Sequence, residues 1–95
     1  MNEIKDIEWF KKVLTPILNN YEIKYRSYEE GDFGSLNQVI FESPKKGGGI
    51  DFWGLGWLGI DVYDYEKNEQ LLNILLEPHQ ELEKEKTFDN LQELL

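Results

Sequence analysis

The chain has 95 residues, of which 40% are hydrophobic and 14% aromatic, and it contains no cysteine. That length predicts a single domain, residues 1–95, with a modest core, and the composition argues against disorder. The lack of cysteine excludes disulfides, thiolate metal sites and cysteine nucleophiles, and 19 acidic against 10 basic residues give a net charge of −9, which disfavours nucleic acid and anionic membranes as partners.

The first residues, MNEIKDIEWF, lack the basic region and apolar run of a signal peptide. No apolar stretch approaches the roughly 20 residues that a membrane-spanning helix needs. We therefore expect a cytoplasmic protein.

The first predicted element is an amphipathic helix. Apolar residues recur at spacings of three and four, with charged residues between them. Asn2 is its expected cap, and Pro16 should end it near Thr15. The apolar positions are Ile4, Ile7, Phe10, Val13 and Leu14.

Strict alternation then predicts two strands. In residues 21–28, Tyr21, Ile23 and Tyr25 lie on one face, opposite Glu22, Lys24 and Arg26. In NQVIFES, residues 37–43, Val39 and Phe41 should point inward while Gln38 and Glu42 point outward. The following segment SPKKGGG is expected to be a loop.

A β-hairpin is predicted around Gly54-Leu55-Gly56 as a three-residue loop. This register pairs Phe52 with Leu58 and Ile50 with Ile60, so that one face is wholly apolar. The other face carries Asp51, Trp53, Trp57, Gly59, Asp61 and Tyr63.

The helical period returns after Tyr65. Leu71, Leu72, Leu75 and Leu76 form a stripe, and Pro78 should break it. A second, more polar helix follows, with Leu82, Phe88, Leu91 and Leu95 expected inward. The predicted fold class is α+β: an N-terminal helix, a four-stranded antiparallel sheet connected by hairpins, and C-terminal helices packed on its apolar face.

Two interpretations of the second hairpin face remain open. A helix covering this face would make Trp53 and Trp57 core residues, with the carboxylates at its edge. Alternatively, the face is a partly exposed acidic and aromatic surface that selects a cationic partner. On the second interpretation the candidate partner-binding residues are Asp51, Trp53, Asp61, Tyr63, Asp64 and Glu66, extended by Glu29, Glu30 and Asp32 of an acidic turn.

No catalytic, cofactor or metal site is predicted. The lysines precede the glycines, unlike in a phosphate-binding P-loop, and GLGWLG, residues 54–59, leads into a strand rather than a helix. The single histidine, His79, fits a surface position better than that of a general base. Asp51 and Asp61 lie close together in the predicted register, but nothing favours a proton-transfer pair over an acidic surface. We expect a protein that is not an enzyme.

The chain resembles bacterial immunity proteins, the inhibitors encoded beside contact-dependent or other polymorphic toxins. The resemblance is one of general build over the whole chain: short, acidic and cysteine-free, with an amphipathic first helix, the hairpin FWGLGWLGIDVYDYEK and leucine-rich C-terminal segments. It implies tight inhibition of a cognate toxin domain, often a nuclease, but assigns no contact residues.

The leading hypothesis is therefore an immunity protein that neutralises a basic toxin domain by steric and electrostatic complementarity. We expect that toxin domain to be a nuclease. The alternative is an adaptor or subunit domain that docks a partner protein through its sheet edge or C-terminal helix. A third is a small enzyme or ligand-binding domain with a pocket beside residues 54–59. The sequence leaves the oligomeric state undetermined.

Overall fold

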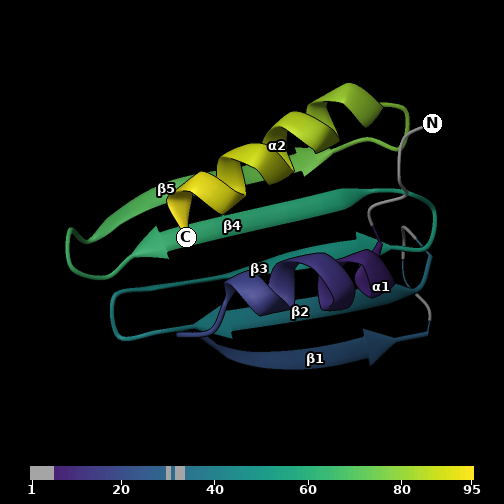
Figure 1. Cartoon of the computed structure of the whole chain (residues 1–95). Coiled ribbons are helices and arrows are strands. Elements are labelled where there is room, and N and C mark those ends of the chain that lie inside the picture. Colours follow the sequence, from purple (N-terminus) through teal and green to yellow (C-terminus); the bar gives the residue numbers. More distant parts are fainter. Residues whose placement is uncertain (1–5, 30, 32–33) are drawn as a thin grey trace.

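The computed structural model describes residues 6–29, 31 and 34–95, and its fold is α+β. Five antiparallel strands lie in the order β1-β2-β3-β4-β5, so each strand pairs with its neighbour in sequence. An N-terminal helical segment lies over one part of the sheet and helix α2 over another, both on the same face (Figure 1). The predicted number of four strands is one too few. The strands are β1 (Glu22–Tyr28), β2 (Leu36–Glu42), β3 (Lys46–Trp53), β4 (Leu58–Asp64) and β5 (Glu69–Leu76).

The N-terminal segment has three consecutive helical parts, α1 (Ile7–Trp9), the π-helical η1 (Phe10–Leu14) and the 3-10-helical η2 (Thr15–Ile17). Asp6 caps it, because its carboxylate accepts a hydrogen bond from the Trp9 N–H at 3.0 Å. The expected cap, Asn2, lies outside the described residues. Pro16 stands in the last, tightened turn, in agreement with the predicted end of the helix.

The β3–β4 hairpin has the predicted register. Ile50 pairs with Ile60 and Phe52 with Leu58. The loop is closed by the Trp53 N–H, which donates to the Trp57 carbonyl at 3.1 Å. Gly56 has a φ of +99°, a value that glycine adopts readily and other residues do not.

The expected loop over SPKKGGG is only partly correct, because β3 already begins at Lys46. Gly47, Gly48 and Gly49 are paired on both sides, with β2 and with β4. Glycine is unfavourable in an isolated strand, which is why the pattern indicated a loop. Here the two flanking strands supply the hydrogen bonds that hold the glycines extended.

The predicted helix over Leu71–Leu76 is wrong: this segment is strand β5. It pairs along β4, with a register irregularity between Val62 and Tyr63. A short apolar run fits a buried helix and a strand equally well by periodicity. Pairing with β4 decides the conformation, and leucine's helical preference is too weak to oppose it.

Helix α2 (Glu81–Leu94) closes the core on the helical face. Phe88 and Leu91 are fully buried, as predicted, and the Phe88 ring contacts Trp9 edge-on with centroids 4.7 Å apart. Leu82 was expected inward but is 59% exposed. None of the helices among the described residues is both long and apolar enough to span a bilayer.

Candidate functional site

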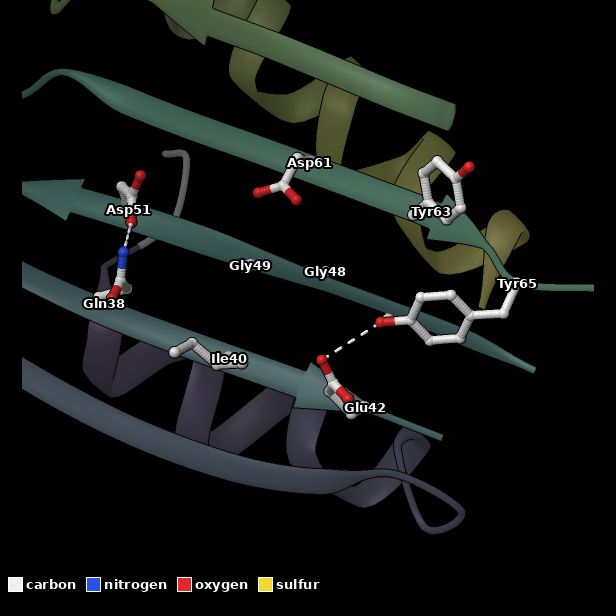
Figure 2. A pocket seen from close by; sticks show the side chains of 10 residues that line it. Gln38, Ile40, Glu42, Gly48, Gly49, Asp51, Asp61, Tyr63 and Tyr65 are labelled. Atoms are coloured by element: carbon white, nitrogen blue, oxygen red, sulfur yellow. Dashed lines mark hydrogen bonds between the residues drawn. The ribbon is translucent and has the colours of Figure 1, made fainter. Parts of the chain in front are cut away.

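The other face of the sheet is open, with both helices lying behind it in Figure 2. Because strand side chains alternate, β2, β3 and β4 place their outward residues side by side in cross-strand rows. At the rows in which β3 contributes a glycine, the face has a hollow with a volume of about 270 Å³, called the acidic hollow below. The three rows are Gln38–Asp51–Gly59, Ile40–Gly49–Asp61 and Glu42–Gly47–Tyr63.

Glycine on β3 gives the hollow its depth. A Cβ at Gly47 would overlap the Tyr65 hydroxyl, so glycine is needed for this ring to approach the strand. A Cβ at Gly49 would lie 3.4 Å from the Asp61 Oδ1 atom and would occupy the floor. The floor is therefore backbone, and the side chains of neighbouring strands form the walls.

Two tyrosines form one end of the hollow. The rings of Tyr63 and Tyr65 are 5.8 Å apart between centroids, and the Tyr65 hydroxyl donates to the Glu42 Oε1 atom at 3.2 Å (Figure 2). Partial burial and the Glu42 and Asp61 carboxylates raise the pKa of Tyr65, so the hydroxyl keeps its proton and remains a donor.

Three carboxylates, Glu42, Asp51 and Asp61, line the hollow, and none of its lining residues is basic. Asp51 accepts a hydrogen bond from the Gln38 amide nitrogen at 2.8 Å. Partial burial, and to a lesser degree the Asp51 carboxylate, raises the pKa of Asp61 above its ordinary value. The hollow is thus a place of negative potential, in which the ionised form of Asp61 is less favoured than in an isolated side chain and would be favoured by a nearby cation.

Asp61→Asn should stabilise the folded protein at neutral pH. The raised pKa means that the folded state of the wild type binds a proton more readily than the unfolded state, so its stability falls as pH rises from the ordinary value through the raised one. Glu42, Asp51, Tyr63 and Tyr65 line the hollow with this carboxylate and are unchanged in the variant. Because the side chain is partly exposed, we expect a gain below about 1 kcal/mol.

Urea unfolding of wild type and Asp61→Asn at several pH values measures this gain. The two proteins should converge in stability at low pH, where the wild-type carboxyl is protonated in both states. A variant that is less stable than wild type at neutral pH would contradict the assignment.

The charge of the open face changes sign toward β1. A second hollow of about 210 Å³ adjoins the first through Ile40 and Glu42, and its other lining residues include Lys24 and Arg26. These two side chains project from the same face as the acidic hollow, because they pair with Ile40 and Gln38. The surface is therefore acidic over β2–β4, whereas the β1 edge carries Lys24 and Arg26 together with Glu22, whose carboxylate lies 3.9 Å from the Lys24 Nζ atom.

The structure brings four of the predicted partner-binding residues together on this face. Asp51 and Asp61 lie in the hollow with Tyr63, and Trp53 follows Asp51 along β3. Trp53 is half-buried, and its ring lies against Gly59, where a Cβ would come within 3.2 Å of it. Within the described residues, neither helix covers this face (Figure 2), so the interpretation of Trp53 as a helix-covered core residue is not supported.

Asp64 does not belong to this surface, contrary to prediction. It ends β4 with its side chain turned inward and is only 6% exposed. Its Oδ1 atom accepts hydrogen bonds from the N–H groups of Glu66 and Lys67, both at 3.0 Å. Asp64 thus shapes the β4–β5 turn, and Glu66 is exposed in that turn, past the end of the strand.

Asp64→Ala should destabilise the fold by about 1–2 kcal/mol, because two turn N–H groups lose their acceptor. Asp64→Asn keeps a side-chain oxygen at the same position and is the matched control. Urea unfolding distinguishes the two. If the alanine variant were as stable as wild type but bound the partner less well, Asp64 would be a partner-binding residue after all.

The acidic turn after β1 is only partly described. Glu29 is exposed and directly follows Tyr28, the last residue of β1, which pairs with Leu36 next to Trp53. Glu30 and Asp32 lie outside the described residues.

Sequence reasoning missed the residues that shape the hollow. The sequence pattern predicts a loop at Gly47 and Gly49, and a loop has no cross-strand pairs. It therefore does not show that Ile40 and Glu42 lie beside these glycines in the sheet. The outward position of Glu42 was itself predicted from the alternation in β2. Tyr65 continues the outward positions Asp61 and Tyr63 beyond β4, and this period-two extension is the signal that could have found it.

No protein-family model, curated protein or solved structure matches the chain.

Proposed function

We propose that this protein is an immunity protein, which binds a basic toxin domain through the open face of its sheet and thereby neutralises it. The observation that supports this proposal is the acidic hollow with its glycine floor on a face that neither helix covers. The resemblance of the whole chain to immunity proteins supplies the partner class.

The physical properties of the face suit a protein partner. Trp53, Tyr63 and Tyr65 offer contact area that loses little side-chain entropy on binding. The glycine floor allows the partner to approach the backbone closely. The net charge of −9 attracts a basic domain over a distance and speeds its association at low salt.

A nuclease is the toxin class that fits best. Such an enzyme must hold a polyanion, so its active site is basic, and an acidic protein can cover it. Binding over or beside that site would exclude the nucleic acid by charge and by volume.

The test is to use the tagged protein as bait for the basic domain encoded beside its own gene, and to co-express the two in cells. We expect binding with a dissociation constant in the nanomolar range or below, an association rate that falls steeply with salt, and survival of cells that make the toxin. A salt-independent rate, or no protection, would contradict the proposal.

The adaptor alternative retains one supporting observation. Strand β5 is an edge strand of the sheet, whose outer backbone groups can pair with a partner strand, and Leu75 on it is 50% exposed on the open face, opposite Gly59. The C-terminal helix is a poorer docking element, because its residues Phe88 and Leu91 are buried in the protein's own core. Partner binding lost through Leu75→Lys but kept in Asp61→Lys would favour the adaptor.

A further inference from the structure

We infer that the hollow over Gly47 and Gly49 receives the side chain of an arginine of the bound protein. This inference rests on the proposed function and specifies its central contact: a guanidinium group that lies over Gly47 and Gly49, beside the Asp61 carboxylate and the ring of Tyr65.

Charge complementarity is the first argument. The carboxylates come from three adjacent strands, Glu42 from β2, Asp51 from β3 and Asp61 from β4, so they surround the floor from more than one side. Two of them already have a partner: Glu42 accepts from Tyr65, and Asp51 accepts from Gln38. The Asp61 carboxylate is exposed to solvent at the wall of the hollow. A cation with several N–H groups, placed in the hollow, could donate hydrogen bonds to the oxygen atoms of these carboxylates.

The shape of the hollow is the second, independent argument. Its floor is flat backbone, because β3 has no outward side chain at Gly47 or Gly49. One wall is aromatic, formed by Tyr63 and Tyr65, and Ile40 adds an apolar contact. A guanidinium is planar, weakly hydrated and able to stack on an aromatic ring while donating sideways to carboxylates. An ammonium group is compact and strongly hydrated, and it gains little from such walls.

The basic side of the face orients the arginine. Lys24 and Arg26 on β1 disfavour a second cation there, although the Glu22 carboxylate lies 3.9 Å from the Lys24 Nζ atom, so we expect the basic segment of the partner over β3 and β4. This arrangement gives the complex one favourable orientation across the strands.

Titration of the isotope-labelled protein with Nα-acetyl-arginine amide tests the inference directly, and Nα-acetyl-lysine amide is the comparison probe. We expect saturable chemical-shift changes centred on the amides of Gly47, Gly49 and Asp61, with arginine binding about tenfold more tightly than lysine. Asp61→Asn should weaken arginine binding about tenfold. Glu69→Gln, which removes an exposed carboxylate on β5 outside the hollow, should leave it unchanged.

Three results would overturn the inference: equal binding of both probes, shifts spread over all acidic segments, or an Asp61→Asn variant that binds arginine normally. Its failure is distinguishable from failure of the proposed function. If the toxin domain still binds and is lost on Asp61→Lys, the open face is the docking surface and only the arginine contact is wrong. If arginine binds but no basic domain is neutralised, the hollow is a guanidinium site with another role.

Discussion

If the proposed function is right, Asp61→Lys should weaken binding of the basic partner strongly while the protein stays folded. Asp61 lies centrally among the acidic residues of the hollow, and its replacement both removes an attractive charge and adds a repulsive one. Truncating a central contact residue of an interface costs about 2 kcal/mol or more, and a charge reversal should exceed that loss, so the dissociation constant should rise by about 30-fold at least. The association rate should also fall. Surface plasmon resonance at two salt concentrations measures both quantities.

Glu69→Lys is the matched control, because it makes the same charge change at an exposed position on β5 outside the hollow. It should lower the association rate slightly and leave the dissociation rate unchanged. If both charge reversals changed the association and dissociation rates equally, only the overall charge of the protein would matter. The proposal that the hollow is the binding site would then be wrong.

Phe88→Ala should destabilise the protein by about 3–5 kcal/mol, which approaches the whole stability of a domain of this size. Phe88 is fully buried beneath α2, between Trp9 of the N-terminal helix and Phe52 of β3, with ring centroids at 4.7 and 6.2 Å. The cavity would therefore open where both helical elements meet the sheet. Urea unfolding followed by tryptophan fluorescence measures the loss.

Leu82→Ala is the control on the same helix, since Leu82 is 59% exposed and its truncation should change the free energy of unfolding by no more than about 0.5 kcal/mol. If the Phe88→Ala variant were as stable as wild type but no longer bound a partner protein, α2 would be a docking element. That result would favour the adaptor alternative.

These two substitutions act on opposite faces of the sheet. Asp61 points to the open face, whereas Phe88 contacts the helical face, so their effects on binding and on stability should be independent. A domain built this way can vary its open face without disturbing its core.

Local residue patterns were enough to predict several elements of this fold. Alternation in β1 and β2 assigned Ile23, Val39 and Phe41 to the core, because a strand with one buried face has a period of two. The hairpin loop at Gly54–Gly56 then set the register of Ile50 against Ile60, since a shift by one residue would expose the apolar face. The same register placed Asp51, Asp61 and Tyr63 on one side.

Other features of the fold depend on contacts between segments that are distant in the sequence. Leu71–Leu76 became β5 because β4 offered an unpaired edge, a fact that no local window contains. Gly47–Gly49 became strand residues because β2 and β4 flank them, and their missing side chains hollow the open face. Asp64 differs, because the period-two alternation of β4 already turns it inward and its hydrogen bonds to the β4–β5 turn are local. In the first two cases the deciding partner lies on another strand, and strand pairing is a long-range interaction that outweighs local preference.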